Sequence, residues 1–225
     1  MVYITGDIHG QLKRIKYFCR NFEPTKQDVL VILGDAGFNY YGEQYDFWMK
    51  EKASHLPITI LCIHGNHEER PYLIPSYKEE EWRGGTVYVE DRFPNLLFAK
   101  DGSVFEFEDG KRVLVAGGAH SIPCCSERLF RVDKPTEEIR RNVEKALEKN
   151  RWKVDYVFSH TCPISVMPQE CFIPGVPRSG INVETERWLE TIAERLNFKR
   201  WFCGHFHTDK TEFPYRFLFN DIILL

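Results

Sequence analysis

Acidic, amide and imidazole side chains follow several short apolar runs of this sequence. They are Asp7, His9, Asp35, Asn66, His67, His160, His205 and His207. A set of oxygen and imidazole donors without thiolates suits manganese, with iron or zinc as alternatives, better than calcium or magnesium alone. Because one metal takes about four protein ligands, a set of this size predicts two divalent metal ions that share a carboxylate. Asp35 is the expected bridge, since its partners precede and follow it along the chain.

Buried strands are predicted to position these side chains. Continuous apolar runs rich in β-branched and aromatic residues are typical of strands covered on both faces. Here the runs are Val2–Thr5, Val29–Leu33, Ile58–Ile63, Val113–Ala116, Tyr156–Phe158 and Trp201–Cys203. In open parallel sheets ligands bind outside the carboxyl ends of the strands, and the candidate donors lie at those ends.

Helical spacing of apolar residues separates several of the runs. One face is formed by Leu12, Ile15 and Phe18, a second by Ile139, Val143 and Leu147, and a third by Trp188, Leu189, Ile192 and Leu196. The alternation of strand and helix predicts a largely parallel sheet in the N-terminal half.

The middle and the end of the chain show a different pattern. The segment Val104–Ala116, with Asp109-Gly110 at its centre, predicts a β-hairpin, and Thr211–Leu224 alternates as antiparallel strands do. The whole pattern predicts a mixed α/β sandwich of two sheets with helices outside. The Pro- and Gly-rich stretch 161–180 is expected to form a functional loop after His160.

Composition narrows the class of protein. The 225 residues are 43% hydrophobic and carry a net charge of −3, with no apolar run long enough to span a bilayer. We therefore expect no membrane partner, and no nucleic-acid partner either, because no basic cluster stands out. Seven cysteines are an odd number, which argues against a disulfide framework. A strand-like run directly at the N-terminus leaves no room for a secretory signal, so we expect a cytoplasmic protein.

The polar motifs resemble those of the calcineurin-like metallophosphoesterase superfamily. The matching segments are Gly6-Asp7-Ile8-His9, Gly34-Asp35, Gly65-Asn66-His67-Glu68, His160 and Gly204-His205-Phe206-His207. The segments Gly34–Tyr40, Gly117–Ser121 and Ser159–Pro163 further resemble a bacterial and prophage-type branch.

The resemblance implies a four-layer α/β/β/α sandwich that forms a single domain over residues 1–225. It also implies one metal held by Asp7, His9, Asp35 and His207, and another held by Asp35, Asn66, His160 and His205. His67 would then be the catalytic histidine beside the phosphate that does not bind metal.

Such a centre suits hydrolysis of phosphoric esters. Two metals lower the pKa of a bound water and neutralise the phosphoryl oxygens, and His67 can protonate the leaving oxygen. No Ser or Cys lies in a recognisable nucleophile motif, so we expect direct attack by metal-bound hydroxide.

The second motif departs from the phosphoprotein phosphatase pattern Gly-Asp-x-x-Asp-Arg-Gly. Phe38, Asn39 and Tyr40 stand where that branch has its Asp-Arg pair and the following Gly. We therefore expect a small phosphomonoester or phosphodiester, such as a nucleotide, as substrate. Arg70, Arg178 and Asn39 are the candidate substrate contacts. A serine/threonine phosphoprotein phosphatase and a catalytically inactive metal-binding regulatory protein are the alternatives.

Overall fold

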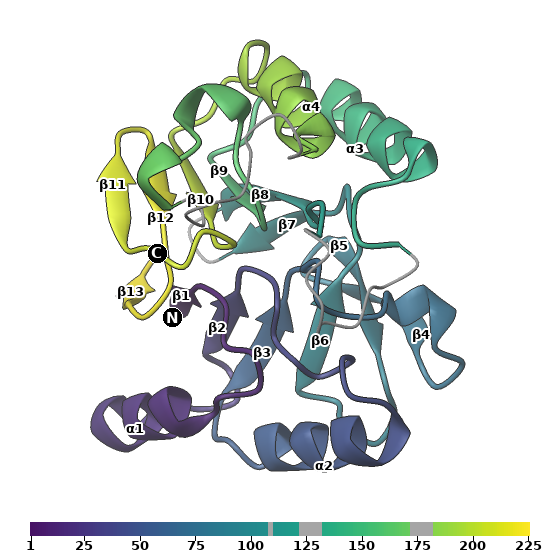
Figure 1. Ribbon diagram of the computed structural model, residues 1–225. Helices are drawn as coiled ribbons and strands as arrows, with labels where there is room; N and C mark the ends of the chain where they lie inside the picture. The colour runs from purple at the N-terminus through teal and green to yellow at the C-terminus, as the bar shows by residue number, and fades with distance from the viewer. Residues whose placement is uncertain (108–109, 122–131, 172–181) are drawn as a thin grey trace.

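The computed structural model describes residues 1–107, 110–121, 132–171 and 182–225. Their strands form two sheets (Figure 1). In spatial order the seven-stranded sheet contains β13 (Ile222–Leu224), β1 (Val2–Thr5), β2 (Val29–Ile32), β3 (Thr59–Cys62), β6 (Leu96–Ala99), β5 (Gly85–Val89) and β4 (Lys78–Trp82). The six-stranded sheet contains β11 (Lys210–Glu212), β12 (Tyr215–Phe217), β10 (Arg200–Cys203), β9 (Tyr156–Ser159), β8 (Lys111–Ala116) and β7 (Val104–Phe107).

Helices cover the outer faces of both sheets. Figure 1 shows α1 (Lys13–Phe22) and α2 (Glu43–Ser54) on one side of the molecule and α3 (Glu137–Lys149) and α4 (Glu184–Ala193) on the other. The other helical turns in the described part of the chain are the short 3₁₀ segments Pro71–Leu73, Ile164–Val166 and Gln169–Cys171. Among the described residues, no helix is long and apolar enough to cross a membrane.

Three layers of buried side chains hold these elements together. Leu30 and Ile32 of β2 face α1 and α2, whereas Val31 of the same strand faces the second sheet. The third layer packs the six-stranded sheet against α3 and α4, with Val143 and Leu189 in contact with it. Because both faces of a central strand are buried, its sequence is apolar without alternation. The predicted four-layer α/β/β/α sandwich is confirmed.

The predicted strands are all present, and they divide between the sheets. β1, β2 and β3 pair in parallel in one sheet, and β8, β9 and β10 pair in parallel in the other. β7 and β8 form the predicted antiparallel pair, although residues 108–109 of its turn lie outside the described part. The tail is antiparallel only in part, because β12 runs parallel to β10 while β11 and β13 pair antiparallel with β12 and β1.

The core between the sheets predicts a stability difference between two leucines. Leu61 in β3 is fully buried there, whereas Leu224 in β13 is 59% exposed. Leu61→Ala should lower the free energy of unfolding of metal-free protein by about 2–5 kcal/mol, because it leaves a cavity. Leu224→Ala should change it by about 0.5 kcal/mol or less. Urea unfolding in a chelator measures both, and equal losses would contradict this view of the core.

Candidate metal centre

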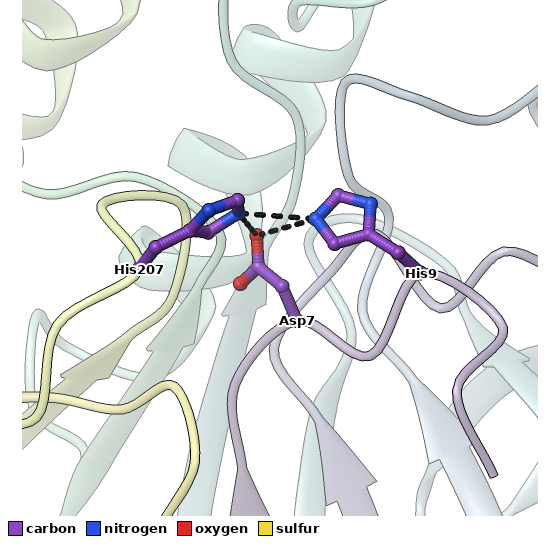
Figure 2. A group of neighbouring side chains, drawn as sticks. All are labelled: Asp7, His9 and His207. Carbon is purple, nitrogen blue, oxygen red and sulfur yellow. Dashed lines mark hydrogen bonds and ion pairs between the residues drawn. The ribbon is translucent and has the colours of Figure 1, made fainter. Parts of the chain in front are cut away.

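Loops at the carboxyl ends of strands from both sheets meet at one place. In each of two groups of side chains, the atoms that could bind a metal all lie within 4.8 Å of one another. The first group is Asp7, His9 and His207, shown in Figure 2, and the second is Asp7, Asp35 and His160. The sequence therefore identified residues that the fold does bring together, although they are up to 200 positions apart (207 − 7).

The first group has the geometry of a cation site. Nε2 of His9 lies 3.0 Å from Nε2 of His207, which lies 3.3 Å from Oδ2 of Asp7. The Asp7 carboxylate is buried, and Oδ2 has no hydrogen bond of good geometry. Two imidazole nitrogens and an unsatisfied carboxylate oxygen that converge on one point fit a divalent metal, because a cation would satisfy all three donors at once.

Burial and charge keep these groups ready for metal. Burial alone would raise the pKa of Asp7, but its contact with His207 and the nearby charges of His160 and His9 hold that pKa far below its usual range. Burial, with His160 beside it, lowers the pKa of His205 to about 3. A carboxylate that stays ionised and an imidazole that stays neutral are the forms that ligate metals.

The second group is oriented by hydrogen bonds behind it. The ring of His160 is fully buried, and its Nδ1 lies 2.8 Å from the carbonyl oxygen of Leu33, so Nδ1–H donates there. On the other side of the ring, Nε2 lies 2.8 Å from Oδ1 of Asn66 and 3.6 Å from Oδ2 of Asp35. The amide of Asn66 donates to Oγ of Ser121 at 3.2 Å, which turns its oxygen toward His160. Such backing contacts fix ligand orientation.

The two aspartates each use one oxygen to bind a neighbouring loop. Oδ1 of Asp7 accepts from the backbone N–H of His205 at 2.9 Å, and Oδ1 of Asp35 accepts from the backbone N–H of His67 at 2.8 Å. The ring of His205 in turn lies 4.9 Å, centroid to centroid, from that of His160. The second oxygen of each carboxylate therefore remains directed at the site.

The backbone of the site is strained at four of its functional residues. His9, Asp35, His205 and His207 have φ angles of 44°, 47°, 67° and 49°. Residues other than glycine rarely adopt this left-handed region, and each such residue costs on the order of 1 kcal/mol or more. Strain that gathers at one place is typical of a functional site, where the surroundings hold the backbone in position.

Glycines that precede the motifs make room for side chains of other motifs. A Cβ atom on Gly34 would overlap with the ring of His160, one on Gly65 with the Asp35 carboxylate, and one on Gly204 with the Asp7 carboxylate. The Gly-Asp, Gly-Asn and Gly-His pairs of the sequence are therefore a packing requirement between loops.

His67 lies at the edge of a pocket beside the first group. The pocket has a volume of about 190 Å³ and is lined by His9, Gly37, Tyr40, Tyr41, His67 and His207. The ring of His67 is half-buried and lies 6.1 Å from that of His9, centroid to centroid. Sequence reasoning missed Tyr40 and Tyr41, whose only signal was their place directly after the second motif.

Two of the candidate substrate contacts, Arg70 and Asn39, are buried and hydrogen-bonded inside the protein. Arg70 is 3% exposed, and its guanidinium pairs with the buried carboxylate of Asp101 at 2.5 Å and donates to the carbonyl oxygen of Val132. This pairing is at odds with the predicted phosphate contact, because the charge of Arg70 is already neutralised inside the protein. Asn39 is also buried, and its Oδ1 accepts from the hydroxyl of Tyr77. Arg178 lies outside the described residues.

Glu68 is a further residue whose role the sequence did not reveal. It is fully buried, and its Oε1 accepts from the backbone N–H of Gly65 at 2.9 Å. Burial, with the charge of Asp35 nearby, raises the pKa of Glu68 to about 8. The side chain therefore supports the turn that carries Asn66 and His67.

Comparison with known sequences agrees with this geometry. Residues 1–209 match the sequence model of the family described as calcineurin-like phosphoesterase. The chain belongs to this family. Membership makes it a metal-dependent phosphoesterase that acts on a phosphorylated substrate. A comparison with curated proteins gave no significant sequence match.

Three solved structures align with most of this chain. One of them aligns with a TM-score of 0.51 at 14% identity, over 96% of this chain and 88% of its own. TT1561 of Thermus thermophilus aligns with a TM-score of 0.47 at 12% identity, over 90% of this chain and 80% of its own. AQ665 from Aquifex aeolicus, a protein of unknown function, aligns with a TM-score of 0.37 at 13% identity, over 88% and 87% of the two chains.

The close approach at Gly65 predicts a selective loss of metal binding. Gly65→Ala should push the Asp35 carboxylate away and weaken manganese binding by about tenfold or more, the size of effect seen for groups that orient ligands. Gly84→Ala is the control for a local backbone cost without steric overlap, because a Cβ there meets nothing within 4 Å although its φ of 78° disfavours alanine. Elemental analysis after dialysis against limiting manganese measures both variants, and circular dichroism checks folding. Full metal content in folded Gly65→Ala would refute the packing argument.

Proposed function

We propose that this protein is a dinuclear metal-dependent phosphoesterase that hydrolyses a phosphomonoester or phosphodiester of a small molecule or nucleotide. The observation that carries the proposal is the convergence of buried carboxylates and imidazole donors in two groups that share Asp7, the first of them beside a pocket bordered by His67. An ester whose phosphoryl group enters this pocket would lie next to His9 and His207 of the first group.

The donors divide into two sets that would each hold one divalent ion. Asp7, His9 and His207 form the first set, and Asn66, His160 and His205 form the second with Asp35. Asp35 is our predicted shared ligand. Asp7 is the competing candidate, because it belongs to both groups of converging atoms. The mixed oxygen and imidazole chemistry favours manganese, with iron and zinc as alternatives.

Bound divalent ions would supply an activated water and neutralise phosphoryl charge. The protein supplies the rest. The neutral imidazoles and the amide of Asn66 add no negative charge, so that the site keeps its attraction for an anionic ester. His67, held in place through its backbone N–H by Asp35, is positioned to donate a proton to the leaving oxygen.

The second motif favours small substrates over phosphoproteins. Phe38, at the position of an Asp in the phosphoprotein phosphatases, is fully buried and belongs to the core under α1 and α2. His67 therefore has no carboxylate partner from that position. The complete donor set argues against an inactive regulatory protein, which has no need of His67.

The setting of the protein is also a proposal. All five cysteines among the described residues are free thiols, which is consistent with a reducing, cytoplasmic environment. We propose that residues 1–225 act as a single domain, since donors from both sheets complete the site. The assignment to a bacterial and prophage-type branch stays a prediction.

His67 provides the test of the reaction. His67→Asn should retain both metals yet slow turnover by roughly 10²- to 10⁴-fold on alkyl phosphate esters, the range for general acid catalysis. The loss should shrink with p-nitrophenyl esters, because p-nitrophenolate departs without a proton. Steady-state kinetics over a series of leaving groups, with metal content measured in parallel, gives the comparison.

His55→Asn, at the exposed end of α2, serves as the control and should match the unmodified protein. If the rate loss does not depend on the leaving group, His67 does not act as the general acid. No metal-dependent hydrolysis of any ester by the unmodified protein would overturn the proposed function itself.

A further inference from the structure

A basic groove lies between α1 and α2, on the outer face of the seven-stranded sheet. It has a volume of about 540 Å³, and its lining residues include four cations and no carboxylate. Lys13, Lys16 and Arg20 come from α1 and Lys52 comes from α2. The three cations of α1 are exposed and form no ion pair within the described residues. On a chain with a net charge of −3, this is a local concentration of positive charge that attracts anions.

Exposed aromatic rings share the groove with these cations. Tyr17 is 66% exposed, Tyr45 is 46% exposed and Trp48 is 44% exposed, and all three line it. The ammonium of Lys52 lies over the ring of Trp48, 2.9 Å from its centroid. Large aromatic side chains are costly to expose to water in this number. Together with a row of cations they provide stacking surfaces and phosphate contacts, the combination that binds single-stranded nucleic acid.

A series of neighbouring rings connects the groove to the candidate metal centre. Centroid distances are 5.5 Å from Trp48 to Tyr45, 4.3 Å from Tyr45 to Tyr41, and 4.7 Å from Tyr41 to Tyr40. Tyr41 and Tyr40 line the pocket that His67 borders. A row of neighbouring rings thus runs from the groove to that pocket.

A second pocket joins the groove to the metal ligands from the α1 side. It has a volume of about 390 Å³, and its lining includes Asp7 and His9 as well as Lys13 and Tyr17, which also line the groove. Figure 1 shows α1 and α2 together along the same edge of the molecule. A chain of nucleotides that lay along α1 would thus reach the phosphoesterase site.

We propose that this groove, lined by Lys13, Lys16, Arg20, Lys52, Tyr45 and Trp48, binds a single strand of nucleic acid and leads one of its phosphodiesters to the metal centre. The proposal rests on the proposed function, for which it names the substrate class. A strand supplies phosphates at regular intervals for the row of cations and bases for the exposed rings. The sequence pattern had suggested no basic cluster, because Lys13, Lys16 and Arg20 are spaced along one helix and only the fold brings Lys52 and the rings of α2 beside them.

Variants that remove positive charge from the groove test nucleic-acid binding separately from ester hydrolysis. Binding of a labelled oligothymidylate of about 12 nucleotides is measured by fluorescence anisotropy in a chelator, so that no hydrolysis occurs. The variant Lys16→Gln/Arg20→Gln/Lys52→Gln should weaken binding at least about tenfold. It should also reduce, by about 2, the slope of the logarithm of the binding constant against the logarithm of the salt concentration. Each phosphate contact on a single strand contributes about 0.7 to that slope.

A matched variant on the opposite side provides the control. Arg141→Gln/Lys145→Gln/Lys149→Gln removes the same charge from exposed positions of α3 and should leave binding unchanged. Equal losses of affinity in the two variants would show that the oligonucleotide is attracted by overall charge. That result would overturn the proposal that the groove binds it.

Aromatic variants separate stacking from charge. Trp48→Ala and Tyr45→Ala should each weaken binding about fivefold or more while the salt dependence stays the same, since base stacking is insensitive to salt in this way. Unchanged affinity in both would overturn the role of the rings. Binding of phosphatidylserine vesicles in preference to the oligonucleotide would assign the surface to a membrane and also overturn the proposal.

The two proposals fail in different ways. If the protein with manganese hydrolyses bis(p-nitrophenyl) phosphate but the chelated protein does not bind the oligonucleotide, the groove is wrong and the proposed function stands. If the oligonucleotide binds as described but no ester is hydrolysed, the proposed function is wrong and the groove stands.

Discussion

Two buried carboxylates organise the centre of this protein. Asp7 and Asp35 each bind the backbone of a loop that belongs to another part of the chain, and each directs its second oxygen into the site. The bond from His205 to Asp7 joins the two sheets, since Asp7 follows β1 and His205 follows β10. Charged hydrogen bonds in a buried setting are strong, and here they fix loops that the strands alone only bring close. These hydrogen bonds require the loops to pass within contact distance of one another. That close approach explains the glycines of the site and the residues with left-handed backbone conformation.

The support of Asp7 extends to the end of the chain. Arg14 on α1 donates to the carbonyl oxygens of Gly6 and Asp7, and also to that of Phe219 near the C-terminus. The ring of Phe219 stacks on that of His207, with centroids 4.5 Å apart. β13 then pairs with β1 beside this contact. The C-terminal segment is therefore part of the support of the first donor group. Arg14 lies on the same helix as Lys13, Lys16 and Arg20 of the groove, so the site and the groove both depend on α1.

Much of the fold and of the site could be predicted because burial and close approach leave strong sequence signals. A strand buried on both faces reads as an apolar run, as in Val29–Leu33, and a glycine before a polar residue marks a loop that must approach another candidate donor.

The sequence signals fail where burial and close approach are absent. β4 contains three consecutive exposed glutamates, Glu79, Glu80 and Glu81, so it shows no apolar face. α2 was missed because exposed Tyr45 and Trp48 occupy positions where a surface helix is usually polar. The burial of Arg70 could not be predicted, because nothing in the sequence indicates its pairing with Asp101, which lies 31 positions away.

The central claim is that loops from two sheets build a site for two divalent ions. The most direct test is anomalous X-ray diffraction, at the manganese absorption edge, from crystals of the protein grown with manganese. The account predicts two anomalous peaks about 3.5–4 Å apart, one bound by His9 and His207 and the other by His160 and His205, with a single aspartate in contact with both. That aspartate would be identified as Asp35 or Asp7 in the same map. A single peak, or peaks that do not contact these histidines, would contradict the account.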